Sequence, residues 1–242
     1  MHIKTVAFDT GGTVLDWHSG IRDALAAVGA NHGIERDWAA IANQYRRLAM
    51  KGIVGQSQPA FNMDDVHFRV LEEVFKSNDL GLFTEADRRQ IAGAWHKLTA
   101  WPDFAGPLRE IRKIMPVVSF TMLPMSLVVD VSRLNGIAWD AVISCEAIGH
   151  YKPDARAYQQ AAKWLAVEPS SILMVACHNF DLNAARSCGF KTAFVRRPQE
   201  WGHEGPPDPL PHPECDFVFD GFEKLSSAVR ALSSPAEQAN DH

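Results

Sequence analysis

Ile3-Lys4-Thr5-Val6-Ala7-Phe8-Asp9-Thr10-Gly11-Gly12-Thr13 places a short β-branched run directly before a carboxylate and a glycine turn. Residues 3–9 predict a buried strand, because they are few, largely apolar and followed at once by polar turn residues. Asp9 then lies at the end of that strand. Gly11, two positions later, cannot supply a second carboxylate. A lone carboxylate in this place suggests a nucleophile and does not suggest half of a magnesium site.

The second half of the chain alternates short apolar runs with segments of helical periodicity. Strands are expected at 116–119, 141–143, 172–176, 192–195 and 217–219, and helices at 125–134, 153–165, 182–188 and after the last strand. Apolar strands that alternate with helices are typical of a parallel sheet covered on both faces. The sequence therefore predicts an α/β fold.

Between the first two strands, apolar residues recur at helical spacing and no strand is expected. Asn62-Met63-Asp64-Asp65 and Thr84-Glu85-Ala86-Asp87 have the pattern of helix starts. We therefore expect a core domain of residues 1–17 and 100–242, interrupted by a helical domain of residues 18–99. An insertion after the first strand lies over the carboxyl ends of the strands, where open α/β sheets bind ligands. The tail after about Ser233 is expected to be disordered.

Composition excludes several classes of function. The 242 residues carry a formal net charge of −5, which gives no reason to expect nucleic acid or an anionic membrane as a partner. No apolar run approaches the roughly 20 residues that span a bilayer. Cys145, Cys177, Cys188 and Cys215 form no zinc spacing, so a cytoplasmic protein with free thiols is expected.

Four polar residues each follow a predicted core strand: Asp9, Ser119, Lys152 and Asp181. Each has a simpler explanation, since Asp9 or Asp181 can cap a turn or helix and Ser119 can satisfy backbone groups at a strand end. In a doubly wound sheet, however, these strand ends converge on one crevice. All four together favour an active site.

These residues carry a resemblance to a known family. Phe8-Asp9-x-x-Gly12-Thr13-x-x-Asp16, Ser119, Lys152-Pro153 and Asp181 resemble the motifs of the haloacid dehalogenase superfamily of hydrolases. Trp101-Pro102-Asp103 and Val175-Ala176-Cys177-His178-Asn179-Phe180-Asp181-Leu182 are most similar to the type II L-2-haloacid dehalogenases. The resemblance covers about residues 3–200. It implies a Rossmann-like parallel sheet with an inserted helical cap domain.

The resemblance also implies a role for each site residue. Asp9 would attack the halogen-bearing carbon and form an ester, and Lys152 would keep Asp9 ionised. Asp181 would orient or deprotonate the hydrolytic water, and His178 would assist it or act as the base. Substrate contacts would come from Ser119 and from the backbone N–H groups of the turn at Thr10 and Gly11.

No metal or cofactor is expected. Phosphatases of the superfamily hold magnesium with the first aspartate and an acid in the fourth motif, and they use a second aspartate as the general acid. Here those positions are Gly11 and Cys177 or His178, and none is the oxygen ligand that Mg²⁺ prefers. A halide leaving group needs no proton, so a dehalogenase tolerates both departures.

Two positions depart from the dehalogenases themselves. Phe120 stands where the family usually has an asparagine that cradles the halide, and Thr121 would substitute in part. In the family, an arginine in the first cap helices contacts the halogen, but in this chain the arginines come later in the aligned stretch. Arg46 or Arg47 would take this role with a shifted register. Alternatively, both belong to a solvated helix face and no residue takes the role. Phe180 would form an apolar wall beside the halide or belong to the core.

The expected partner is a small anionic substrate, a short 2-halo acid that is converted to a 2-hydroxy acid. Two other functions stay open: a magnesium-dependent phosphatase or phosphonatase, and a binding protein that has kept the fold and lost turnover. Dimers are common in the resembling family and the cap region is rich in tryptophan, so a homodimer is expected.

Overall fold

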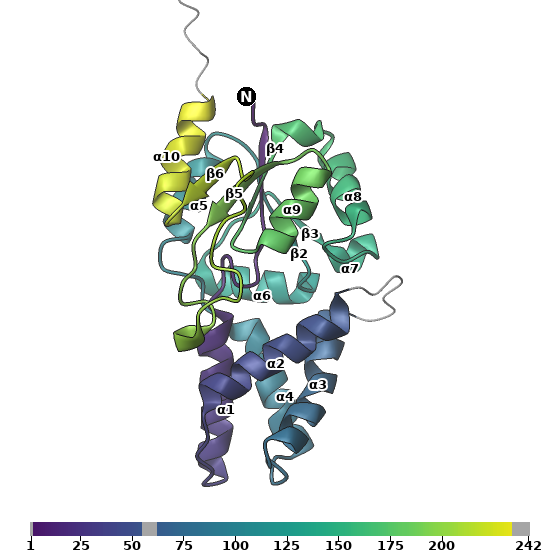
Figure 1. The fold of residues 1–242 in the computed structure, drawn as a ribbon, viewed down its shortest axis with the longest axis vertical. Coiled ribbons are helices and arrows are strands. Elements are labelled where there is room, and N and C mark those ends of the chain that lie inside the picture. The colour runs from purple at the N-terminus through teal and green to yellow at the C-terminus, as the bar shows by residue number, and fades with distance from the viewer. Residues whose placement is uncertain (1, 55–61, 234–242) are drawn as a thin grey trace, which may run out of the picture.

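A computed structural model describes residues 2–54 and 62–233. Its centre is a six-stranded sheet in the order β3-β2-β1-β4-β5-β6, and every neighbouring pair is parallel (Figure 1). The strands are β1 (Thr5–Phe8), β2 (Val117–Thr121), β3 (Ala141–Ser144), β4 (Ile172–Ala176), β5 (Lys191–Val195) and β6 (Phe217–Phe219). The predicted α/β fold is confirmed.

The first strand occupies the middle of this sheet. Phe8 pairs with Ser119 of β2 on one side and with Val175 of β4 on the other. All four residues of β1 are buried, as its apolar, β-branched sequence requires for a strand covered on both faces. The residue that follows β1, Asp9, therefore lies at the centre of the sheet's carboxyl edge.

Helices cover both faces of the sheet. Helices α5 (Ala105–Arg112) and α10 (Phe222–Ser233) pack together on one face, whereas α8 (Ala155–Leu165) and α9 (Asn179–Ser187) pack together on the other (Figure 1). Helix α6 (Met125–Asn135) and the short α7 (Cys145–Ile148) flank β3 near the carboxyl edge.

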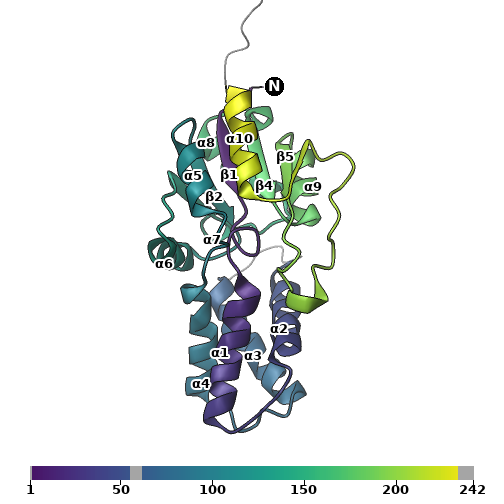
Figure 2. The same cartoon turned by 90° about the vertical axis from the view of Figure 1, so that its left-hand side faces the viewer.

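A second, all-helical region lies next to the carboxyl edge of the sheet (Figure 1). It consists of α1 (Trp17–Asn31), α2 (Trp38–Ile53), α3 (Met63–Ser77), α4 (Glu85–Gly93) and a 3₁₀ turn, η1 (Ala94–Lys97). Figure 2 shows β1 leading almost directly into α1. The two predicted helix starts are confirmed, because Asn62 and Thr84 each form a capping box. The exact domain boundaries stay a prediction.

Aromatic side chains fill the helical region. Trp17 and Trp95 stack with a centroid distance of 6.4 Å, and His67 lies flat on Trp95 at 4.0 Å. Tyr45 packs edge-on against both His67 and Trp95. These side chains are fully buried. Because the tryptophans of the cap are inside it, they do not provide the apolar surface on which the homodimer was predicted; the dimer stays a prediction.

Two helix starts differ from the sequence expectation. The helix expected at 153–165 begins at Ala155 with Asp154 as its N-cap, so Pro153 lies just outside it. The helix expected at 182–188 begins three residues earlier, at Asn179. Asp181 therefore lies within the first helical turn and does not cap the helix. The predicted disordered tail lies outside the described residues.

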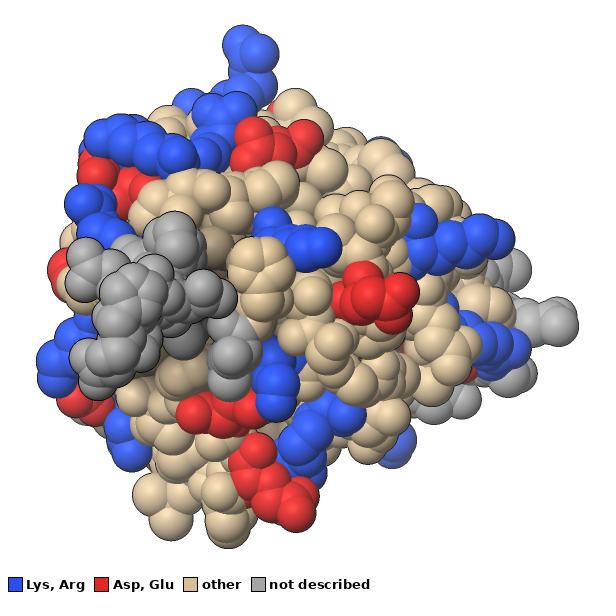
Figure 3. All heavy atoms as spheres, turned by 90° about the horizontal axis from the view of Figure 1, so that it is seen from above, with Lys and Arg blue, Asp and Glu red and all other residues tan. Residues whose placement is uncertain are grey.

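The visible surface has charges of both signs, as expected for a chain with a small net charge. On the face seen in Figure 3, Lys and Arg side chains are interspersed with Asp and Glu. In the part of the chain that the structure describes, none of the helices has both the length and the apolar character that crossing a bilayer needs. The cytoplasmic location stays a prediction.

Buried His67 makes the stability of the fold sensitive to acid. Burial holds the pKa of His67 well below its usual 6.5, and the nearby charges of Arg46 and His96 add to this. Neither ring nitrogen has a hydrogen-bond partner. The unfolded chain binds a proton below about pH 6.5 and the folded chain does not, so folding weakens as the pH falls.

His67→Phe should remove this loss while keeping the stacking on Trp95. Between pH 7.5 and 5.5 the wild type should lose about 1 kcal/mol more free energy of unfolding than the variant. Urea unfolding of both proteins at the two pH values measures this difference. Equal losses in the two proteins would contradict a neutral His67 in the folded state.

Candidate active site

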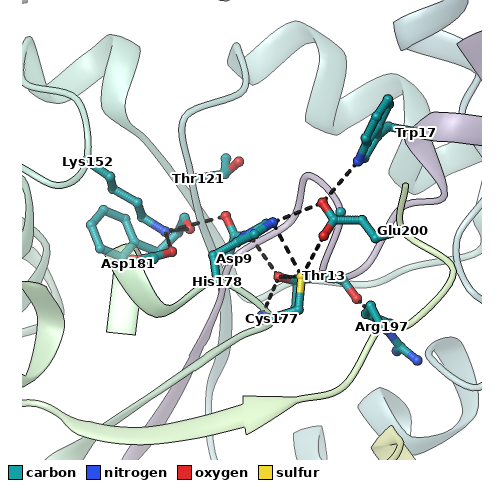
Figure 4. A network of polar contacts seen from close by, with 12 residues as sticks. Asp9, Thr13, Trp17, Thr121, Lys152, Cys177, His178, Asp181, Arg197 and Glu200 are labelled. Carbon is teal, nitrogen blue, oxygen red and sulfur yellow. Dashed lines mark hydrogen bonds and ion pairs between the residues drawn. The ribbon is translucent and has the colours of Figure 1, made fainter. Parts of the chain in front are cut away.

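Side chains from three strand ends meet at the carboxyl edge of the sheet. Lys152 Nζ lies 3.6 Å from Asp9 Oδ1 and 2.7 Å from Asp181 Oδ2. Figure 4 shows Lys152 and Asp181 on one side of Asp9, and His178, Cys177 and Glu200 on the other. The crevice expected from the sequence therefore brings together Asp9, Lys152 and Asp181, with His178 beside them.

Asp9 is buried and surrounded by donors. Its Oδ2 accepts hydrogen bonds from Thr13 Oγ1 at 2.7 Å and from His178 Nδ1 at 3.2 Å. Burial raises the pKa of the Asp9 carboxyl, but the Lys152 charge and the hydrogen bonds from His178 and Thr13 outweigh it and lower the pKa to about 2. Asp9 is an anion at neutral pH, and its Oδ1 is the less engaged oxygen.

Lys152 is held on every side. Its ammonium donates to Asp181 Oδ2 and to the backbone carbonyl of Phe120, both at 2.7 Å, and lies 4.3 Å above the Phe120 ring. Burial disfavours the ammonium, but the Asp181 and Asp9 carboxylates raise the pKa of Lys152. Tyr158 donates to Asp181 Oδ1 at 2.7 Å, so both oxygens of Asp181 are hydrogen-bonded.

His178 bridges two carboxylates. Its Nδ1 faces Asp9 Oδ2 at 3.2 Å and its Nε2 faces Glu200 Oε1 at 2.9 Å. Burial lowers the pKa of His178, but the neighbouring Cys177 sulfur, the Glu200 carboxylate and the hydrogen bond to Asp9 raise it well above 6.5. An imidazolium donates from both nitrogens and cannot accept a proton. This geometry suits His178 as a hydrogen-bond donor to Asp9 and not as the base.

A tight turn allows Glu200 to reach the site. Glu200 is buried and also accepts from Trp17 Nε1 at 3.0 Å. Gly12 has φ +91°, and a Cβ there would overlap the Glu200 carboxylate, so only glycine fits. Thr13, next in the turn, also accepts a hydrogen bond from the backbone N–H of Cys177 at 3.0 Å.

A small cavity of about 20 Å³ opens over Asp9. Among its lining residues are Gly11, Thr121, Phe180 and Arg46. The Arg46 guanidinium is buried against the stacked pair of Trp17 and Trp95, 5.5 and 5.4 Å from their ring centroids. Its Nη1 has no hydrogen-bond partner, although a buried donor normally has one. The cavity is therefore lined by a cationic side chain that has an unused donor.

Other predicted substrate-binding residues lie elsewhere. Thr10 and Ser119 are buried and bond to each other through their hydroxyls at 2.7 Å. Phe120 is fully buried under Lys152 and does not line the cavity. Arg47 is half-exposed, forms an ion pair with Glu204, and borders a larger pocket instead. Phe180 lines both cavities and is 37% exposed, so it does not belong to the core.

Sequence reasoning missed Glu200 and Tyr158. Glu200 follows β5, so extending the search for polar strand ends to the fifth strand would have found it. Tyr158 lies within α8, where its spacing is that of any buried helix residue. Nothing in the sequence marks it as the partner of Asp181.

The donor set does not fit the magnesium that other enzymes of this fold use. Mg²⁺ requires several oxygen ligands in octahedral geometry. Asp181 already accepts from Lys152 and Tyr158, and the position between β4 and α9 offers the Cys177 thiol and the His178 ring. No step through magnesium follows from these residues.

Comparisons with known proteins agree with the motifs. A family model described as haloacid dehalogenase-like hydrolase matches residues 3–189. An (S)-2-haloacid dehalogenase of Pseudomonas putida is 27% identical over 207 residues, which cover 81% of this chain and 86% of that protein. One from Xanthobacter autotrophicus is 28% identical over 201 residues, covering 81% and 76%. The crystal structure of a defluorinating L-2-haloacid dehalogenase matches with TM-score 0.87 and 32% identity, covering 94% and 95%.

Lys152 should carry much of the stability of the site. Lys152→Met leaves two buried carboxylates without their ammonium, so we expect the free energy of unfolding to fall by about 3–5 kcal/mol. Adding Asp181→Asn should recover part of this loss. Urea unfolding of the single and double variants measures both effects. Lys163→Met, the same change at an exposed position of α8, is the control; a loss equal to that of the control would contradict the predicted role.

Proposed function

The chain belongs to the haloacid dehalogenase-like hydrolases, and we propose that it is a metal-independent hydrolase that converts a short 2-haloalkanoic acid to the 2-hydroxy acid. One observation carries the proposal: Asp9 is an ionised, donor-surrounded carboxylate beneath a small cavity that is also lined by Arg46, whose Nη1 has no hydrogen-bond partner. A nucleophile and an anion-binding group therefore face the same space.

In the first step Asp9 Oδ1 attacks the carbon that bears the halogen. The new C–O bond forms an ester and the C–X bond electrons leave with the halide, so no proton is needed. Lys152, 3.6 Å from Oδ1, keeps Asp9 ionised before the attack. Arg46 supplies a charge-assisted donor to an anionic group of the substrate.

In the second step water attacks the carbonyl carbon of the ester. Oδ2 is then the carbonyl oxygen and becomes an oxyanion, for which Thr13 and His178 are donors already in place. Burial raises the pKa of Asp181, which makes it a better base for the proton of the water. As the intermediate collapses, Asp181 passes this proton to the alkoxide oxygen and the 2-hydroxy acid is released. The Asp9 carboxyl formed in this way, whose second oxygen now comes from water, then loses its own proton to solvent and is again a carboxylate.

The size of the cavity favours the shortest substrates. About 20 Å³ accommodates one or two water-sized groups. Its apolar wall includes Met50, Met63, Met122 and Leu123. A two- or three-carbon halo acid fits this chamber with the least displacement of these side chains.

Halide release from chloroacetate, 2-chloropropionate or fluoroacetate should persist in EDTA and disappear in Asp9→Asn. Asp37→Asn, an isosteric change at the exposed N-cap of α2, is the control and should keep full activity. A single-turnover incubation of the wild type should add the mass of the dehalogenated acid to the protein. Absence of halide from all three acids, or activity that appears only with Mg²⁺, would refute the proposal.

Substitution of two adjacent arginines tests whether Arg46 binds an anionic group, because Arg47 serves as a surface control. Arg46→Met should slow halide release roughly 100-fold, as loss of one transition-state donor does. Arg47→Met should change it little, because Arg47 is half-exposed and paired with Glu204. Steady-state kinetics of both variants, with urea unfolding to verify the fold, makes the comparison. Equal losses in the two variants would contradict the assignment of Arg46.

A further inference from the structure

Three side chains of different ligand chemistry surround one point beside Asp9. Cys177 Sγ lies 3.4 Å from His178 Nε2 and 3.6 Å from Glu200 Oε2, and His178 Nε2 lies 2.9 Å from Glu200 Oε1. Ligand atoms of all three residues lie within 4.8 Å of one another. Cys177 and Glu200 follow β4 and β5, so adjacent strand ends hold the cluster together.

These separations match the edges of a tetrahedral zinc site. Zn–S bonds of about 2.3 Å and Zn–N or Zn–O bonds of about 2.0–2.1 Å place neighbouring ligand atoms roughly 3.3–3.6 Å apart. The two distances from Cys177 Sγ already have this length. The contact of 2.9 Å between His178 Nε2 and Glu200 involves the other carboxylate oxygen, Oε1, and is a hydrogen bond whose proton the metal would replace.

The surroundings supply the outer contacts that such a site needs. A metal-binding histidine usually donates its other ring N–H to a carboxylate, which fixes the ring. His178 Nδ1 already has Asp9 Oδ2 at 3.2 Å in that position. The Thr13 hydroxyl lies 3.4 Å from Cys177 Sγ. Binding releases the thiol proton of Cys177 and the Nε2 proton of His178, which leaves a thiolate, a neutral ring and a carboxylate as ligands.

The cluster is also accessible. Cys177, His178 and Glu200 all line a pocket of about 290 Å³, which adjoins the small cavity over Asp9 and shares His178 with it. Proline-rich residues 206–208 and Arg47 form part of its rim. Three protein ligands leave the fourth tetrahedral position open toward this pocket. Thiolate and imidazole select zinc-class metals and disfavour magnesium.

We infer that Cys177, His178 and Glu200 form a binding site for a zinc-class divalent metal beside the nucleophile. The metal is not a participant in the proposed reaction. Its open position instead attracts the carboxylate of a substrate into the larger pocket, away from Asp9. Occupancy is therefore expected to lower turnover, an effect that rests on the proposed function, whereas binding itself does not.

Co²⁺ is the direct probe, because a cobalt–thiolate bond gives a charge-transfer absorption in the near ultraviolet. Titration of the metal-free full-length chain with Co²⁺ should produce this band at one metal per chain, and Zn²⁺ should displace it. Cys177→Ala should abolish the band, and Glu200→Gln should weaken Zn²⁺ binding by at least about 100-fold, because losing a direct ligand should cost no less than the largest losses seen for outer-shell partners.

Cys188→Ser is the matched control, since Cys188 is partly exposed on α9's C-terminal side and lies outside the cluster. It should keep the band. A wild type without the band, or a band that persists in Cys177→Ala, would overturn the site. The absorbance reports binding whether or not a halo acid is turned over, so failure of this site and failure of the proposed reaction are distinguishable.

If halide release is observed, Zn²⁺ should inhibit the wild type and the control at similar concentrations. Cys177→Ala should need roughly 100-fold more Zn²⁺ for the same inhibition, because it lacks one of the three ligands. Equal sensitivity of Cys177→Ala and the control would overturn the link between this site and turnover.

Discussion

The ammonium of Lys152 is the group on which the site depends. It is fully buried, and a buried charge is tolerated only when it is paired and hydrogen-bonded. Asp181, Asp9 and the Phe120 carbonyl meet that requirement. The same contacts join the segment after β3 to the ends of β1, β2 and α9's first turn. The charge compensation that stabilises the crevice therefore also helps to fix the position of the Asp9 carboxylate.

Side-chain cations surround the carboxylates of this site. A Cβ at Gly11 would lie 3.8 Å from Arg46 Nη2, so a guanidinium stands beside the position where metal-using relatives carry a second aspartate. Lys152, His178 and Arg46 together balance Asp9, Asp181 and Glu200. A neutral cluster of this kind keeps Asp9 ionised without an added divalent cation. This cluster places no general acid in the glycine turn, and a halide leaving group would not require one.

The sequence predicted the elements whose signals are local. Strand-end polar residues, capping boxes and the glycine turn each follow from a few adjacent residues, and the α/β fold follows from their order. Contacts between side chains that are far apart in the sequence had no such local signal. Phe120 was expected at the halide and instead packs under Lys152, because side chains alternate along a strand and Thr121 takes the cavity side. The partnership of Arg46 with two tryptophans, and of Asp181 with Tyr158, depends on packing between helices that periodicity does not specify.

Glu200, which is distant from His178 in the sequence, determines how the His178 ring is protonated. From the sequence alone, a histidine near the nucleophile is equally suited to orienting water or accepting its proton. Glu200 removes this ambiguity, because a carboxylate on Nε2 and another on Nδ1 make both nitrogens donors. A donor 3.2 Å from Asp9 Oδ2 stabilises negative charge there, on the free carboxylate and equally on the oxyanion of the ester in the proposed reaction. Gly12 leaves room for Glu200, so the turn that follows Asp9 also influences the protonation state of His178.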